Sequence, residues 1–331
     1  MPMSSPSRLE VFRDVAGPCL APAGSVAAVG AFDGLHVGHR ALLARARERA
    51  AELGAVPMVV SFEPLPRAFF ATTPVARLGS VREKIDGIAA AGIARLLMLR
   101  FNRALTSMVA EDFVRQVLVQ RAGIREVWVG EAFRFGHRRG GDIAMLQRMG
   151  AELGFTTRVL EPVQMDGQRV SSTRLRELLA TGDFDAAASL LGRRFAISGH
   201  VAHGARLGRT LGFPTANIHL GRRTSPVEGI FAVRVGFDDG PCVWPAVASL
   251  GVRPTVDGRE PLLEAHLFDF EGDLYGRRIV VEFVAKLRDE EKFDDLDALA
   301  AQMHEDAAGA RRVLGMAVQG SADRHRASET A

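Results

Sequence analysis

The chain has 331 residues, of which 47% are hydrophobic and 24% charged, and its formal net charge is +3. This is ordinary globular composition, and the length favours two domains over one. No basic cluster is interleaved with aromatic residues, two cysteines give neither a disulfide framework nor a zinc spacing, and no apolar run suits a membrane span or a signal peptide. We therefore expect a cytoplasmic protein that binds neither nucleic acid nor membranes; the sequence leaves its oligomeric state open.

The first motif lies near the N-terminus. An apolar run at 26–29 is followed by the turn-forming pair Asp33-Gly34 and then by the spacing of an amphipathic helix, which is typical of a buried strand, a turn and a helix. His36 and His39 are three residues apart where the helix should begin, so both imidazoles can face the same way. Gly38 removes a side chain beside them, and a helix N-terminus favours an anion. The motif predicts a phosphate site.

The rest of the first half alternates between short apolar runs and helical spacing. The expected strands are 57–62, 95–99 and 126–129, and the expected helices are 81–91 and 110–121. This alternation predicts a parallel sheet covered on both faces. Ligands of such sheets bind at the carboxyl ends of the strands, which is where the two histidines should lie.

Two later segments of the first half also suggest a ligand site. Phe133 and Phe135 lie among glycines and arginines directly after an expected strand, which would suit an aromatic, phosphorylated ligand; a solvated basic loop is the alternative. Ser172 and Thr173 precede a short expected helix at 177–180, with Arg176 one turn in. Hydroxyl and basic groups at a helix start make a second anion site, although a helix cap alone would explain the hydroxyls.

The second half is dominated by short strands separated by glycine-containing turns. The expected strands are 195–201, 229–235, 242–250, 262–268 and 278–283, which favours a compact antiparallel barrel with a domain boundary near 182–192. A helix with Leu296, Leu299, Met303 and, later, Val313 and Leu314 should cover the barrel. The small, polar tail after Gly315 is expected to be disordered.

The densest motif of this half spans 208–217. Its glycines would let backbone amides approach a phosphate, and Pro214 would stiffen the turn that presents Thr215 and Asn217. A hydroxyl and an amide oxygen are hard ligands that suit Mg²⁺. A strand-to-turn segment with a capping threonine is the alternative interpretation.

These motifs together resemble a known family. The segments 30–39, 62–64, 130–136 and 171–176 are similar in order and spacing to the FMN adenylyltransferase half of bacterial bifunctional riboflavin kinase/FAD synthetases. The segments 208–217, 251–255, 263–267 and 287–293 resemble the riboflavin kinase half. The resemblance implies an α/β nucleotidyltransferase-type parallel-sheet domain at 1–183, a small antiparallel β-barrel kinase domain with a C-terminal helix at 184–315, and a tail at 316–331.

The same resemblance implies that riboflavin is phosphorylated by ATP to FMN and that FMN is then adenylated by a second ATP to FAD, with Mg²⁺ serving both reactions. It implies that His36 and His39 bind and neutralise the ATP phosphates and that Glu264 is the general base of the kinase reaction. Further residues implied in ATP or phosphate binding are Gly30, Phe32, Asp33, Gly38, Ser172, Thr173, Arg176, Gly208, Arg209 and Gly212. Those implied in flavin binding are Phe133, Phe135 and Arg253, and those implied in Mg²⁺ binding are Thr215 and Asn217.

Two alternatives stay open at this point. Family members usually carry Asp or Asn where this chain has Ala132, so the chain could be a riboflavin kinase whose N-terminal half persists as a scaffold. It could also be a flavin-binding sensor or storage protein without turnover. That second alternative predicts damaged catalytic positions, whereas Glu264, Thr215 and Asn217 are all present.

Overall fold

The computed structural model describes residues 8–204, 207–221, 223–238, 240–255 and 258–316, and the expected tail therefore lies almost wholly outside the described residues. Contacts divide the chain into two compact units. Unit 1 comprises the residues up to Glu177 together with Ser189–Arg193, and unit 2 comprises Leu178–Ala188 and the residues from Arg194 onward.

Unit 1 is built on a parallel sheet, as predicted. Its strands are β1 (Glu10–Phe12), β2 (Ser25–Val29), β3 (Val56–Glu63), β4 (Arg95–Arg100), β5 (Ile124–Gly130) and β6 (Thr156–Leu160). Every pair is parallel and the spatial order is β1-β4-β3-β2-β5-β6. The chain winds outward from β2 in one direction and from β5 in the other, so the carboxyl ends of these two neighbours form a switch point where ligands bind.

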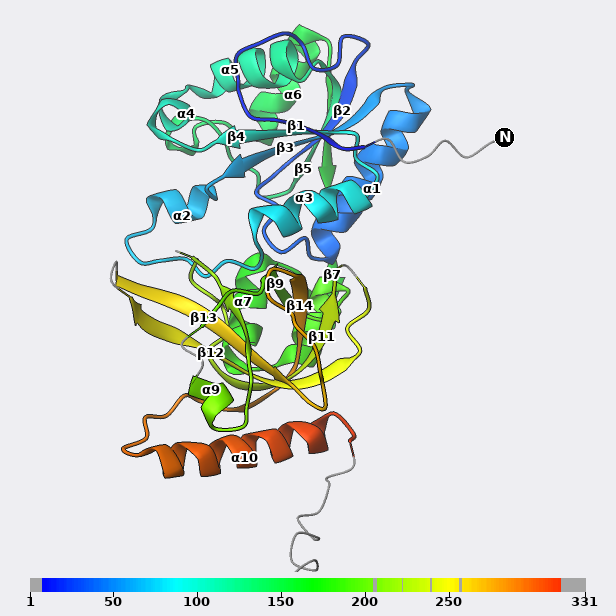
Figure 1. Ribbon diagram of the computed structural model, residues 1–331. Helices are drawn as coiled ribbons and strands as arrows, with labels where there is room; N and C mark the ends of the chain where they lie inside the picture. Colours follow the sequence, from blue (N-terminus) through cyan, green and yellow to red (C-terminus); the bar gives the residue numbers. More distant parts are fainter. Residues whose placement is uncertain (1–7, 205–206, 222, 239, 256–257, 317–331) are drawn as a thin grey trace, which may run out of the picture. The chain divides into compact units, whose positions relative to one another are not determined.

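Helices cover both faces of this sheet (Figure 1). The helices of unit 1 are α1 (Val37–Glu52), α2 (Pro66–Phe70), α3 (Val81–Ala90), α4 (Arg103–Ser107), α5 (Ala110–Asp112), η1 (Phe113–Arg121), η2 (His137–Arg139) and α6 (Ile143–Leu153), and a hairpin of β7 (Gln164–Met165) and β8 (Gln168–Arg169) follows. Helix α7 (Ser172–Thr181) belongs to unit 1 up to Glu177 and to unit 2 beyond it. Side chains of β2 alternate: Val26 and Ala28 pack with α1 and α3, whereas Ala27 and Val29 pack with η1 and α6.

The helix expected at 110–121 is correct in place but not in type. Only Ala110–Asp112 is α-helical, and η1 continues as a π-helix in which, for example, the Ala122 amide donates to the Val117 carbonyl at 2.9 Å. The wider turns still direct Val114 and Leu118 into the core. Hydrophobic spacing alone does not distinguish the two helix types, because both bury one side.

Unit 2 is a nearly closed antiparallel barrel, as predicted. Its strands are β9 (Ala196–His200), β10 (Ala216–His219), β11 (Gly229–Phe237), β12 (Trp244–Thr255), β13 (Gly258–Leu267) and β14 (Arg278–Arg288), and its helices are α8 (Phe184–Leu191), α9 (Leu207–Thr210) and α10 (Leu296–Val313). The spatial order is β10-β13-β12-β11-β14-β9, and a bridge between Ala202 and Asn217 joins the two ends. Strand β10, which carries the end of the 208–217 motif, was not among the predicted strands.

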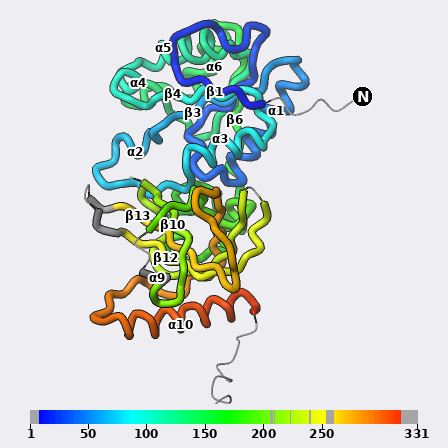
Figure 2. The backbone as a smooth tube through the Cα atoms, in the orientation of Figure 1, coloured from blue at the N-terminus to red at the C-terminus, as the bar shows by residue number. Residues whose placement is uncertain are grey.

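Helix α10 lies along the barrel (Figure 2) and contacts β11, β12 and β14, as predicted. Of the predicted apolar positions, Leu314 is buried, whereas Leu296 and Val313 are 56% and 47% exposed. The small Ala310 and the charged Asp306 are also buried, and the Asp306 carboxylate accepts hydrogen bonds from Arg288 Nε at 2.8 Å and Nη2 at 2.7 Å. Small side chains and a bidentate ion pair let the helix approach the strands closely.

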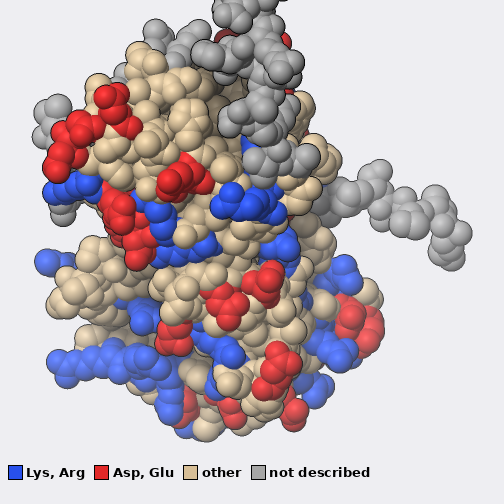
Figure 3. All heavy atoms as spheres, turned by 90° about the horizontal axis from the view of Figure 1, so that it is seen from below, with Lys and Arg blue, Asp and Glu red and all other residues tan. Residues whose placement is uncertain are grey.

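On the face of the molecule shown in Figure 3, acidic and basic side chains lie interspersed with uncharged ones. Within the described part of the chain, no helix is long and apolar enough to cross a membrane.

We predict that Asp306→Asn lowers the free energy of unfolding of unit 2 by about 1–3 kcal/mol, because it breaks a largely buried, charge-assisted pair. Asp269→Asn is the matched control, because Asp269 pairs with Arg311 of the same helix but is 59% exposed; it should cost less than about 1 kcal/mol. The chain has two tryptophans, so Trp244 fluorescence in a Trp128→Phe background reports urea unfolding of unit 2 alone. Equal losses for both variants would contradict this account of α10.

Candidate active site

A cavity of about 1070 Å³ opens in unit 1 at the carboxyl ends of the central strands. Its aromatic lining residues are Phe62, Phe70, Phe101, Phe113, Phe133 and Phe135, its basic lining residues are Arg67, Arg134, Arg138, Arg139 and Arg176, and its hydroxyl lining residues are Thr106, Ser172 and Thr173. Gly30, Ala31, Asp33 and Ala132 also line it. Rings offer apolar area to a planar group, and guanidinium and hydroxyl groups bind phosphate oxygens, so this cavity suits an aromatic, phosphorylated ligand.

The aromatic lining comes from several segments. The rings of Phe133 and Phe135 stack with centroids 5.5 Å apart and planes 20° apart. Phe70, on α2, is 67% exposed and packs edge-on against Phe101 at 5.9 Å. Of these residues, the sequence interpretation named Phe133 and Phe135 as flavin contacts and missed Phe70 and Phe101. The only sequence signal for Phe70 was an aromatic pair, Phe69-Phe70, shortly after Pro66.

The hydroxyl groups before α7 have separate partners. Ser171 caps the helix, because its Oγ accepts a hydrogen bond from the Arg174 amide at 3.2 Å. The alternative interpretation, in which Ser172 or Thr173 caps the helix, is therefore wrong: α7 begins at Ser172, so both residues already belong to it. The Ser172 hydroxyl donates to the Asp33 carbonyl at 3.1 Å, and Thr173 Oγ1 accepts from Arg67 at 3.1 Å.

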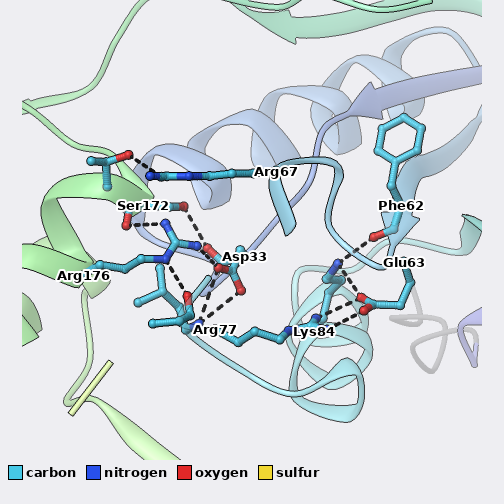
Figure 4. A network of polar contacts seen from close by, with 11 residues as sticks. Asp33, Phe62, Glu63, Arg67, Arg77, Lys84, Ser172 and Arg176 are labelled. Atoms are coloured by element: carbon cyan, nitrogen blue, oxygen red, sulfur yellow. Dashed lines mark hydrogen bonds and ion pairs between the residues drawn. The ribbon is translucent and has the colours of Figure 1, made fainter. Parts of the chain in front are cut away.

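Asp33 and Arg176 join the turn after β2 to helix α7 (Figure 4). The Asp33 carboxylate accepts from Arg176 Nη2 and, at 3.3 and 3.4 Å, from the Leu78 amide. Arg176 also donates to the carbonyls of Ala76 at 2.6 Å and Ser172 at 2.8 Å. Burial raises the pKa of Asp33 despite the opposing positive charge of Arg176, and burial likewise lowers the pKa of Arg176.

The two histidines stack on each other at the start of α1. Their ring centroids are 3.7 Å apart and their planes 11° apart. His36 is the N-cap, and its Nδ1 accepts from the His39 amide at 3.2 Å, which places the proton of a neutral His36 on Nε2. Burial lowers the pKa of His36 to about 4. Burial also lowers the pKa of His39, and the charges of His36 and Lys84 lower it further.

Neither histidine is among the described residues that line the large cavity, so the structure places them beside it rather than in its wall. His39 Nδ1 is buried and finds no hydrogen-bond partner among the described residues. Phe32, at a φ of 50°, is fully buried and packs its ring into the core. A Cβ on Gly30 would lie 3.3 Å from that ring, and one on Gly38 would lie 3.3 Å from the His36 ring, so both glycines permit close packing in the turn.

In unit 2, the 208–217 motif forms a tight loop that leads into β10. The Gly208 carbonyl accepts from the amides of Leu211 at 3.1 Å and Phe213 at 2.7 Å. A Cβ on Gly208 would lie 2.4 Å from the Phe213 carbonyl oxygen, and Gly212 has a φ of +83°, so both positions require glycine. The backbone of Arg209 lies in α9, but its side chain lies outside the described residues.

The polar residues expected at the kinase site lie on, or directly before, adjacent strands of the barrel. Thr215 Oγ1 donates to Asn217 Oδ1 at 3.4 Å. Asn217 on β10 is the register partner of Glu264 on β13, which places a hydroxyl, an amide and a half-buried carboxylate close together. The Arg253 side chain, named as a flavin contact, lies outside the described residues.

Comparison with known proteins matches each unit to a protein family. Residues 20–174 match the family model described as FAD synthetase, and residues 191–314 match the one described as riboflavin kinase. A crystal structure described as a macrolide-efflux protein from Streptococcus pneumoniae is similar in fold, with a TM-score of 0.74 and 27% identity over 90% of this chain and 97% of that one.

Curated relatives match across both units. A bifunctional riboflavin kinase/FMN adenylyltransferase of Pseudomonas fluorescens is 49% identical over 87% of this chain and 92% of that protein. The protein of the same name from Escherichia coli strain K12 is 44% identical over 88% of this chain and 94% of that protein. The chain therefore belongs to the family of bacterial bifunctional riboflavin kinase/FMN adenylyltransferases, enzymes that use ATP to make FMN and then FAD.

Proposed function

We propose that unit 1 adenylates FMN and unit 2 phosphorylates riboflavin, with 1–183 and 184–315 as the working limits of the two domains. The observation that carries this proposal is the unit 1 cavity, in which aromatic rings and phosphate-binding groups face one space at the strand switch point. The distribution of these groups suits FMN, which has a planar ring system at one end and a phosphate at the other.

In unit 1, a phosphate oxygen of FMN attacks the α-phosphorus of ATP while the bond to pyrophosphate breaks. Phe133 and Phe135 contact the flavin ring, and Ser172, Thr173 and Arg176 bind the phosphates. His36 and His39 hydrogen-bond the ATP phosphates from neutral imidazoles, because burial disfavours their protonated forms in the free protein. No covalent intermediate is required, so catalysis depends on positioning and on stabilising the charge that develops in the transition state.

In unit 2, Glu264 accepts the proton of the riboflavin 5′-hydroxyl as the γ-phosphate of ATP is transferred. Backbone amides near Gly208, Arg209 and Gly212 bind the phosphates, and we assign Arg253 to the flavin on sequence resemblance alone. This assignment is supported by the half-buried position of Glu264, whose register partner on the neighbouring strand is the buried Asn217.

The residues of unit 2 also fit a magnesium ion. Thr215 and Asn217 present two hard oxygens within 3.4 Å of each other, and Mg²⁺ commonly takes one or two protein ligands and leaves its other positions to water and phosphate. No three His, Cys, Asp or Glu side chains gather as a metal site anywhere in the described ranges. Bound Mg²⁺ would neutralise the phosphate charges of ATP.

We expect Glu264→Gln to lower the rate of FMN formation by about 100-fold or more, because the amide cannot accept the hydroxyl proton. Conversion of supplied FMN to FAD should be unchanged, since that reaction belongs to unit 1. Both rates are measured by chromatography of the flavins on the same preparation. Near-normal FMN formation would show that Glu264 is not the base.

Replacing both His36 and His39 with Ala should lower FAD formation from FMN by at least about 100-fold, because two preorganised donors to the phosphates are lost. FMN formation from riboflavin in the same chain should remain normal and serves as the control. Loss of both activities, in a variant with unchanged urea unfolding, would contradict the assignment of the two reactions to separate units.

The neutral state of the histidines predicts a pH profile. If cationic imidazoles with an ordinary pKa near about 6.5 were required, kcat/KM for FAD formation would fall about tenfold for each pH unit above that value. Since burial holds the pKa of His36 at about 4, we expect kcat/KM to stay level from about pH 7 to about pH 8.5. A steep fall of kcat/KM over that range would contradict this prediction. If the residual activity of the His36→Ala/His39→Ala variant did not show the same fall, a protonated histidine would be required.

A further inference from the structure

Three charged residues lie behind the unit 1 cavity and take no part in the proposed reaction. Glu63 is the last residue of β3, Arg77 lies in the loop before α3, and Lys84 lies on α3. Their side chains are 19%, 15% and 3% exposed, and none of the three is among the described residues that line the cavity. Burying three charges is unfavourable unless they are paired, so their partners matter.

Both cations pair with Glu63. Arg77 binds Glu63 in a bidentate arrangement, with Nη2 at 2.9 Å from Oε2 and Nη1 against Oε1. Lys84 Nζ lies 3.4 Å from Glu63 Oε2 and donates to the carbonyl of the cavity residue Phe62 at 3.2 Å. Burial alone would raise the pKa of Glu63, but the hydrogen bond from Arg77 and the charge of Lys84 outweigh it, so that carboxylate stays ionised.

The loop that carries Arg77 connects this cluster to the cavity residues Asp33 and Arg176 (Figure 4). The residue before it, Ala76, accepts a hydrogen bond from Arg176 Nε at 2.6 Å. The residue after it, Leu78, donates to the Asp33 carboxylate. Three consecutive residues therefore have three different partners, and a shift of Arg77 would move the backbone groups that orient Asp33 and Arg176.

We propose that Glu63, Arg77 and Lys84 are positioning residues for adenylyl transfer, which fix loop 76–78 so that Arg176 and Asp33 keep their places at the cavity. None of the three contacts the reacting atoms, and the inference rests on the proposed function of unit 1. Because the charge that Arg176 stabilises grows in the transition state, its displacement should reduce kcat more than it raises KM.

The decisive comparison is Glu63→Gln with Glu126→Gln. Glu126 is in the same unit, on β5, and it also accepts a bidentate pair, from Arg49 Nε at 3.1 Å and Nη2 at 3.2 Å. Its side chain is 3% exposed, and it is not among the cavity residues. Both substitutions keep the size of the side chain and remove its charge. They differ in where the paired arginine lies: Arg77 is in loop 76–78, whereas Arg49 is on α1.

We expect Glu63→Gln to lower kcat for FAD formation by about 10- to 100-fold with a change in KM for ATP below about threefold. Glu126→Gln should leave kcat within about twofold. Each kcat is normalised to the folded fraction from urea unfolding. Arg77→Lys, which keeps the charge but not the bidentate geometry, provides a milder variant if Glu63→Gln fails to fold, and a loss of about tenfold is expected.

Equal kcat values for Glu63→Gln and Glu126→Gln, or for Arg77→Lys and the unaltered chain, would overturn the positioning role. An effect on KM alone would overturn it as well. The activity of the unaltered chain distinguishes failure of the positioning role from failure of the proposed function. If the unaltered chain makes no FAD from FMN, the proposed function of unit 1 is wrong, and the positioning role is wrong with it.

Discussion

The ion pair between Asp33 and Arg176 holds the unit 1 site together. It joins residues 143 positions apart, the turn after β2 and the second turn of α7. The Asp33 side chain is 5% exposed, so removing its cationic partner would leave a buried charge, at a cost of about 3–5 kcal/mol. The turn is also held in an uncommon conformation, with Phe32 and Leu35 at positive φ. Its shape is therefore fixed by the protein before a nucleotide arrives, which is what charge stabilisation by preorganised groups requires.

The two units meet the same chemical problem, the binding of phosphates, in different ways. The proposed site of unit 1 comprises the switch point of a parallel sheet, a helix start capped by a histidine, and guanidinium groups held by carbonyls and carboxylates. The proposed site of unit 2 comprises a glycine loop and neighbouring oxygen atoms at antiparallel strands. Because the described groups of each proposed site come from one unit, the two reactions of the family need not share a catalytic group.

Much of this architecture follows from local patterns in the sequence. Alternating apolar runs and helical spacing suffice for the parallel sheet, and the position of His36 and His39 at a helix start is confirmed. The burial of Asp306 on α10 could not be predicted, because this carboxylate is buried only through its pairing with Arg288 at the end of β14. The same reason hides the cluster of Glu63, Arg77 and Lys84, whose charges look like solvent-exposed ones until the fold brings them together. The role of the exposed Phe70 ring could not be predicted either, because it depends on the cavity that the ring lines.

The central claim is that one chain carries two complete and separate sites. Its most direct test is a chromatographic assay with ATP, Mg²⁺ and either riboflavin or FMN, in which FMN, FAD and pyrophosphate are followed over time. The account predicts that riboflavin yields FMN and then FAD, and that pyrophosphate appears in step with FAD in both assays. Accumulation of FMN without any FAD, even when FMN is supplied directly, would contradict it and would mean that unit 1, with Ala132 in its cavity, serves only as a scaffold.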